Sequence, residues 1–345
     1  MNSRNTAIDI MKISGATLIV LHHYQQGTGI VLRHIAFYGG KFNFGYVVEL
    51  FFLISGLLTY RTFKNTDNLP TLPKFWIGKM RRILPLLTIS VMVEAALRYI
   101  YLRMSGGEKV YFGLLDIIVN ATGTSWGIFQ VKAINQSTWY LSALMLCYLE
   151  LYISIWISKK LKIQPDYPWL LLMIIGVAAT TYGWKGLFIE GGIGRGMFSF
   201  FAGTMLAKHM GQVKRRKDWL LLVLPASFIL LLKYFHDFVR SGAFVFYTLF
   251  IWIPIVVIAI RYIPHVKKGR IIEVLGISSF GVYIWNEPLS VIRNMLPILT
   301  DASLQTKTAM TIFVICNWIV GVCSYFLIEK PIDKVLKKLI DARSK

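Results

Sequence analysis

Long apolar stretches recur along the whole chain, each about as long as a helix that crosses a membrane. A bilayer core requires roughly 17 to 25 mainly apolar residues per helix. The composition agrees, because 55% of the 345 residues are hydrophobic and 16% are charged, whereas soluble proteins average about 25% charged residues. The pattern excludes a disordered chain and a soluble enzyme. It predicts an all-α, polytopic membrane helix bundle.

Ten stretches are predicted to be transmembrane helices. The fifth and sixth are short, and 110–128 is an ambiguous further stretch, so the predicted count is ten to within one. The ten ranges are 10–30, 44–63, 83–102, 138–158, 169–184, 194–207, 219–235, 243–260, 274–299 and 309–328.

The positive charges indicate how these helices are oriented. Cytoplasmic loops carry an excess of Lys and Arg, and here 26 of the 38 basic residues fall on the N-terminus, alternate loops and C-terminus. We therefore expect a multi-pass protein of the cell membrane with both chain termini in the cytoplasm. The net charge of +21 is explained by topology, so we expect no nucleic-acid partner. The sequence does not indicate an oligomeric state.

We expect a single domain over residues 1–345, because neither an internal repeat nor a linker is visible. Cys147, Cys316 and Cys323 all lie in apolar stretches, and the last two are seven residues apart. That spacing is about 10 Å on a helix, too far for a disulfide. We predict no disulfide and no metal site. The first apolar stretch lacks small-residue cleavage chemistry and is predicted to be a retained helix.

Several polar side chains lie at comparable depth inside the predicted helices, where they indicate function because insertion of charge is costly. Together they predict a hydrated cavity between helices. His23 has two interpretations: it takes part in a reaction, or it forms a structural hydrogen bond to a neighbouring helix. Glu94 is interpreted mainly as an i,i+4 partner of Arg98. The polar residues are His22, His23, Glu49, Glu94, Asn286 and Glu287.

Small residues recur around the sixth stretch, and we interpret their spacing as helix packing rather than a ligand loop. They are Gly192, Gly196, Ser199 and Gly203. Several soluble catalytic signatures are missing from the sequence: GxxxxGK[ST], HExxH and HxxxD do not occur. The chemistry is therefore expected to be of a membrane-specific kind.

Six sequence elements, in order along nearly the whole chain, resemble the acyltransferase-3 family of integral membrane O-acyltransferases. Together they are far more specific than any one alone. The elements are Asp9 with Lys12 and His23; Gly45 with 48–56 (VELFFLISG); 79–85 (KMRRILP); 139–142 (WYLS); 279–285 (SFGVYIW); and 325–331 (YFLIEKP).

Some positions depart from the family's pattern. Lys12 and Lys79 stand where Arg is more usual. Lys keeps the positive charge but lacks the planar guanidinium that binds a carboxylate or phosphate through two hydrogen bonds. Asn286 stands where many relatives have His, and Leu144 where a Glu is often found. No hydrolase-like domain follows the tenth predicted helix, so we expect the short form of the family.

The resemblance implies transfer of an acyl group, usually acetyl, from cytoplasmic acetyl-CoA to a hydroxyl of a cell-surface glycan or related acceptor. Acetyl-CoA is a substrate, and we expect no other cofactor. His23 would act as general base or carry a transient acyl group; the first role is chemically suitable because an imidazole of ordinary pKa near 6.5 accepts a proton at neutral pH. Glu49 would orient that imidazole. The expected substrate-binding residues are Lys12, Lys79, Arg81, Arg82, Trp139, Tyr283 and Asn286.

A function of a different class uses the same polar residues for binding. A secondary transporter or flippase would export a small acid or a glycan precursor. Transporters often show repeated halves, and this sequence shows no repeat. A third hypothesis is a scaffold for envelope assembly. It does not explain the presence of His23 inside a helix or of the basic cluster at 79–82. Breakdown of acetyl-CoA by the purified protein would distinguish the enzyme from both alternatives.

Overall fold

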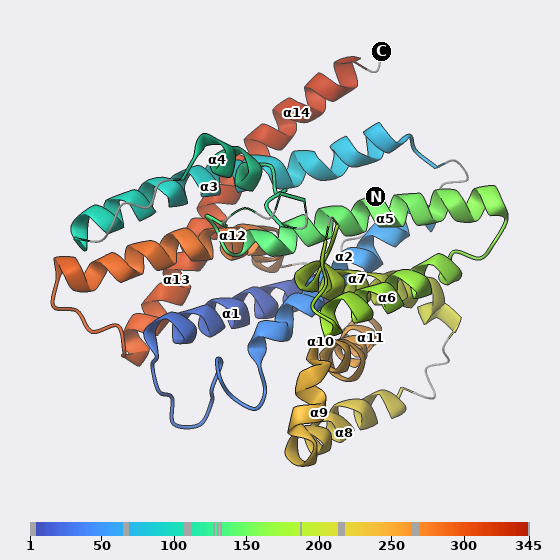
Figure 1. Cartoon of the computed structure of the whole chain (residues 1–345), viewed down its shortest axis with the longest axis horizontal. Helices are drawn as coiled ribbons and strands as arrows, with labels where there is room; N and C mark the ends of the chain where they lie inside the picture. Colours follow the sequence, from blue (N-terminus) through green and yellow to red (C-terminus); the bar gives the residue numbers. More distant parts are fainter. Residues whose placement is uncertain are drawn as a thin grey trace.

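The computed structural model describes residues 5–64, 69–106, 112–126, 128–129, 131, 133–186, 188–212, 218–263 and 269–343. These parts of the chain are almost entirely helical (Figure 1). One small antiparallel ribbon pairs β1 (Lys185–Gly186) with β2 (Ile189–Glu190). The helical elements are α1 (Thr6–Thr28), η1 (Phe44–Tyr46), α2 (Val47–Lys64), α3 (Leu72–Met104), α4 (Leu114–Ala121), α5 (Thr138–Leu161), α6 (Asp166–Thr181), α7 (Gly191–His209), η2 (Met210–Gln212), α8 (Leu220–Tyr234), α9 (His236–Ser241), α10 (Ala243–Phe246), η4 (Tyr247–Trp252), α11 (Ile253–Tyr262), α12 (Arg270–Leu299), α13 (Lys307–Ser324), η5 (Tyr325–Glu329) and α14 (Lys330–Arg343).

Each of the ten predicted stretches lies on a helix or on directly adjoining helical segments. Helices α1, α7 and α12 are long enough to span a membrane, but polar residues lower their mean hydropathy, and α6 and α8 are apolar but short. The helices thus support an all-α membrane protein, whereas ten crossings stay a prediction. Among the described residues, the segments both long and apolar enough to cross a membrane are Phe44–Phe63, Leu72–Met104, Thr138–Leu161, Ala243–Tyr262 and Lys307–Ile340.

The segments richest in Lys and Arg meet at one end of the bundle, which we call the basic end. Arg81 of α3 pairs with Asp333 of α14 at 3.1 Å, and Lys208 of α7 pairs with Asp166 at the start of α6. Figure 1 shows the beginning of α1 and helix α14 on the same side of the molecule. That the basic end faces the cytoplasm stays a prediction from the charge pattern.

Glycines bring α2 and α7 into backbone contact. A Cβ atom at Gly203 would lie 2.0 Å from the carbonyl oxygen of Leu53, and one at Gly56 would lie 2.0 Å from that of Phe200. Without a side chain at either position, the two helix backbones approach as closely as small-residue interfaces in membranes permit. This contact confirms the helix-packing interpretation for Gly203.

Helices α1 and α12 lie parallel, as two close contacts show. At the basic end, a Cβ at Gly276 would lie 2.6 Å from Cβ of Asp9; at the other end, a Cβ at Gly27 would lie 2.4 Å from Nη2 of Arg293. The separation is 18 residues on α1 and 17 on α12, so the two helices rise in register. Polar residues of both helices therefore meet at matching depths.

Candidate active site

A cavity of about 1140 Å³ opens at the basic end, between α1, α2, α3, α5, α12 and the α13–α14 segment. Positive side chains from several of these elements line it, together with three carboxylates and a group of aromatic rings. The cations are Lys12, Arg61, Arg81, Arg82 and Lys330, and the carboxylates are Asp9, Glu329 and Asp333.

The expected basic residues of α3 lie in different surroundings. Arg82 is exposed and lines the cavity, whereas Arg81 also lines it but is paired with Asp333. Lys79 does not line the cavity. Its Nζ donates a hydrogen bond to Oγ1 of Thr59 at 2.9 Å and lies 4.5 Å from the ring centre of Tyr148, which does line it.

Three aromatic rings close the inner end of the cavity. The ring centres of Tyr140 and Tyr283 are 5.4 Å apart, and Phe51 lies 6.4 Å from the first and 6.3 Å from the second. The hydroxyl of Tyr283 donates to the carbonyl oxygen of Ser137 at 2.9 Å, which fixes that ring. We call Phe51, Tyr140 and Tyr283 the aromatic layer.

His23 lies beyond the aromatic layer, on the side away from the cavity. Because α1 and α12 are in register, Tyr283 is level with Ala16, and His23 is seven residues further, about 10 Å along the axis. Nδ1 of His23 lies 3.1 Å from Oε1 of Gln26. Because an amide oxygen only accepts hydrogen bonds, this contact favours the tautomer with the proton on Nδ1 and the lone pair on Nε2.

His22 has different partners from His23. It is buried, and its Nδ1 donates to the carbonyl oxygen of Phe37 at 2.8 Å. Gln25 supports the same segment, because its Oε1 accepts from the backbone nitrogens of Phe37 and Tyr38 at 2.6 and 2.9 Å. His22 and Gln25 thus hold the loop that connects α1 to η1.

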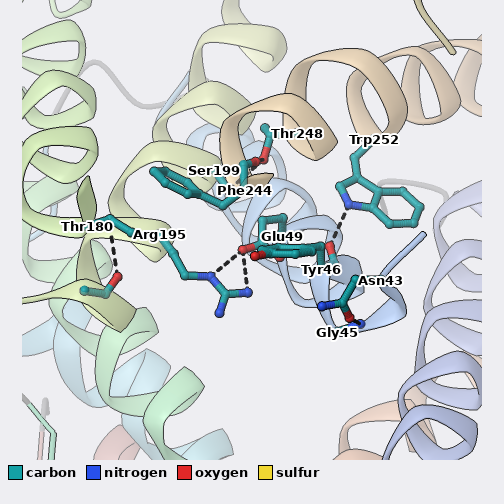
Figure 2. Close-up of polar contacts among 11 residues, drawn as sticks. Asn43, Gly45, Tyr46, Glu49, Thr180, Arg195, Ser199, Phe244, Thr248 and Trp252 are labelled. Carbon is teal, nitrogen blue, oxygen red and sulfur yellow. Dashed lines mark hydrogen bonds and ion pairs between the residues drawn. The ribbon is translucent and has the colours of Figure 1, made fainter. Parts of the chain in front are cut away.

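Glu49 of α2 is fully buried and forms an ion pair with Arg195 of α7 (Figure 2). Oε1 of Glu49 accepts from Nε and Nη2 of Arg195 at 2.8 and 2.7 Å. The guanidinium lies over the rings of Tyr46 and Trp139, 5.0 and 5.1 Å from their centres. The expected partner of Glu49 was a histidine, and the side chain that it contacts is an arginine.

Of the other polar residues predicted inside the helices, Glu94 has a charged partner and Asn286 has none among the described residues. Oε1 of Glu94 pairs with Nη2 of Arg98 at 2.8 Å, which confirms the i,i+4 interpretation. Asn286 is fully buried, and neither polar atom of its side chain has a hydrogen-bond partner among the described residues. An unsatisfied buried amide of this kind is costly and marks a position for a bound group or ordered water.

Arg195 and Arg293 were not among the site residues predicted from the sequence. Both are charged residues inside apolar stretches, so the rule that led to Glu49 and His23 also applies to them. Their partners are distant in sequence, since Arg195 is 146 residues from Glu49. Among the described residues, no group of three or more His, Cys, Asp or Glu side chains is arranged to hold a metal ion.

The arrangement combines a basic cavity at one end, an aromatic layer, and a histidine with a basic Nε2 beyond it. A protein-family model described as an acyltransferase domain matches residues 5–328. No curated protein sequence matches the chain significantly, and no solved structure does so.

We predict that Arg195→Met destabilises the protein far more than Glu49→Gln. Removing Arg195 leaves a fully buried carboxylate without its counter-ion, a change that costs roughly 3–5 kcal/mol in proteins. Glu49→Gln leaves the Arg195 guanidinium unpaired, but that side chain is 25% exposed and lies over two aromatic rings. The double variant should recover much of the loss. Thermal unfolding of the purified variants in detergent measures this, and equal losses for the two single variants would contradict it.

Proposed function

The chain belongs to the acyltransferase-3 family, whose model covers nearly all of it, and we propose that it is an acyl-CoA-dependent O-acyltransferase. In this proposal the protein lies in the cell membrane and crosses it several times. It transfers an acyl group, in the first instance acetyl, from cytoplasmic acetyl-CoA to a hydroxyl of a cell-surface glycan or related acceptor. His23 serves as the general base.

The observation that carries this proposal is the basic cavity below the aromatic layer. Coenzyme A carries phosphates at one end and the thioester at the other, so its site needs cations at an entrance and an apolar path inward. The cavity supplies Lys12, Arg61 and Arg82 near its entrance and the rings of Tyr140 and Tyr283 at its inner end. Guanidinium groups recognise phosphate oxygens with short, charge-assisted hydrogen bonds.

In the proposed reaction, the hydroxyl of the acceptor gives its proton to Nε2 of His23 while its oxygen bonds to the acyl carbon. The carbon–sulfur bond of the thioester then breaks. The thiolate of coenzyme A takes the proton from the imidazolium, which restores His23. General-base assistance of this kind contributes about 10²- to 10⁴-fold to a rate.

The acceptor is proposed to bind at the end opposite the cavity entrance, where Trp139 and Tyr46 flank the Glu49–Arg195 pair. Aromatic faces pack against the apolar C–H faces of sugar rings. In this scheme Glu49 orients Arg195 and the rings stacked on it. Asn286 supplies an amide whose hydrogen-bonding capacity is unused within the described residues.

Sealed inverted membrane vesicles test this function. The vesicles come from native cells that lack the chromosomal copy and express the chain, so that the basic end faces outward. Acetyl-CoA labelled in its acetyl group is added outside. We expect label in the enclosed glycan and one free coenzyme A outside for each acetyl group transferred. The proposal would be overturned if these vesicles released no more coenzyme A than vesicles with His23→Ala. Transport of an unmodified solute would instead favour the transporter hypothesis.

We predict that His23→Ala lowers the rate of acyl transfer by at least about 100-fold, because the general base is lost. His22→Ala should keep most of the activity, since His22 contacts the backbone of Phe37. That variant should instead lose about 1–2 kcal/mol of stability with its buried hydrogen bond. Initial rates and thermal unfolding of both variants measure this. An inactive His22→Ala with an active His23→Ala would reverse the assignment.

We predict that Arg82→Ala raises the KM for acetyl-CoA about tenfold, the loss expected for one charge-assisted hydrogen bond to phosphate. Lys79→Met is the matched control, because Lys79 carries the same charge but does not line the cavity. It should leave the KM within about twofold. A KM that rises for Lys79→Met and not for Arg82→Ala would place the phosphate contact at Lys79.

A further inference from the structure

Arg293 of α12 is a buried cation beyond the aromatic layer. It is 5% exposed, and its guanidinium lies 5.3 and 5.4 Å from the ring centres of Tyr24 and Phe313. Among the described residues, no carboxylate oxygen lies within ion-pair distance of Arg293. Burial of a charge without a paired counter-ion is strongly unfavourable, so an arginine in this position indicates a functional requirement.

One edge of this guanidinium is occupied and one nitrogen is not. Oδ1 of the adjacent Asn294 accepts from Nε at 3.1 Å and from Nη2 at 3.0 Å. Nη1 is buried and has no hydrogen-bond partner among the described residues. Glu287 acts on Arg293 only as a more distant charge. Nη1 is therefore a charged donor with its hydrogen-bonding capacity unused.

The guanidinium lies beside the face of α1 that carries His23. His23 and Gly27 are four residues apart and share one helix face. A Cβ at position 27 would lie 2.4 Å from Nη2 of Arg293, so the absence of a side chain at Gly27 makes room for the guanidinium. Arg293 is also close enough to His23 for the two groups to interact electrostatically.

We propose that Arg293 is a catalytic residue whose Nη1 donates a hydrogen bond to the oxyanion formed during acyl transfer at His23. This inference rests on the proposed function. When the acceptor oxygen bonds to the acyl carbon and its proton passes to His23, the carbonyl π electrons move onto the carbonyl oxygen. Arg293 stabilises that charge. The charge leaves on the thiolate when the carbon–sulfur bond breaks.

The occupied edge of the guanidinium argues for a single oxygen atom rather than a carboxylate or phosphate group. Arginine recognises those groups bidentately, through two parallel N–H donors. Here Asn294 takes one N–H from each of Nε and Nη2, and Nη2 also lies against α1 at Gly27, so Nη1 is the nitrogen left without a partner. A fixed donor aimed at one developing charge in a site shielded from water is the arrangement that stabilises an oxyanion. Asn294 is then a positioning residue that fixes the orientation of the Arg293 guanidinium.

The test measures kcat and KM for acetyl-CoA in the vesicle assay described above, together with thermal unfolding of each purified variant. We expect Arg293→Gln to lower kcat about 100-fold, as loss of one oxyanion donor does, and to leave KM within about threefold. Arg293→Lys keeps the charge without the fixed geometry, so its kcat should lie between those of Arg293→Gln and the unmodified protein.

Asn294→Asp separates catalysis from a structural role. It has the same shape but gives Arg293 a permanent carboxylate partner, which neutralises the donor. We expect kcat to fall at least tenfold while the unfolding temperature stays equal or rises. Gln305→Glu is the charge control: Gln305 contacts the backbone of Thr28 at the same end of the bundle, and kcat should not change.

Two results would overturn this inference while leaving the proposed function intact. The first result is that the unmodified protein transfers acetyl and that Arg293→Gln or Asn294→Asp transfers it with the same kcat. The other is a change in KM alone, which would assign Arg293 to substrate binding. If Arg293→Gln does not fold, Asn294→Asp decides the question. An unmodified protein that releases no coenzyme A instead overturns the proposed function itself.

Discussion

The parallel packing of α1 against α12 sets the depth of every group in the candidate site. Its two close contacts lie at opposite ends, Gly276 against Asp9 and Gly27 against Arg293. Because the helices rise together, the residues that line the cavity lie on one level of both, and the residues beyond the aromatic layer lie on another. A Cβ at position 276 would meet Cβ of Asp9 and push the two helices apart, whereas a Cβ at position 27 would displace the guanidinium of Arg293 from its place beside α1.

The fold was predictable from the sequence wherever the signal is local. Apolar stretches identified the helices because membrane length and hydropathy are properties of a continuous segment. Glu94 and Arg98 were predictable as a pair because a helix places residues four apart on one face. The packing role of Gly203 followed from small-residue spacing. The number of crossings was not settled in this way, because polar residues within α1, α7 and α12 weaken the same signal.

The candidate site was only partly predictable, because its contacts join residues far apart in the chain. Glu49 was found as a charge within an apolar stretch, but its partner Arg195 lies on α7 and leaves no local pattern. Arg293 meets the face of α1 near His23 only because α12 runs beside it. Lys79 and Arg82 belong to one basic motif, yet three residues rotate the side chains by about 300°. Only Arg82 of these two faces the cavity.

The aromatic layer has a consequence for the electrical state of the membrane. An aqueous cavity that enters the bilayer from one side carries the bulk potential inward, so the voltage falls mainly across the thin region that stays dry. In the proposed arrangement that region would begin at the packed rings of Phe51, Tyr140 and Tyr283. Moving one elementary charge through 100 mV takes about 2.3 kcal/mol, whereas a neutral group crosses without electrical work. A tightly packed aromatic barrier therefore lets a protein admit a highly charged molecule to its interior without becoming a leak for ions.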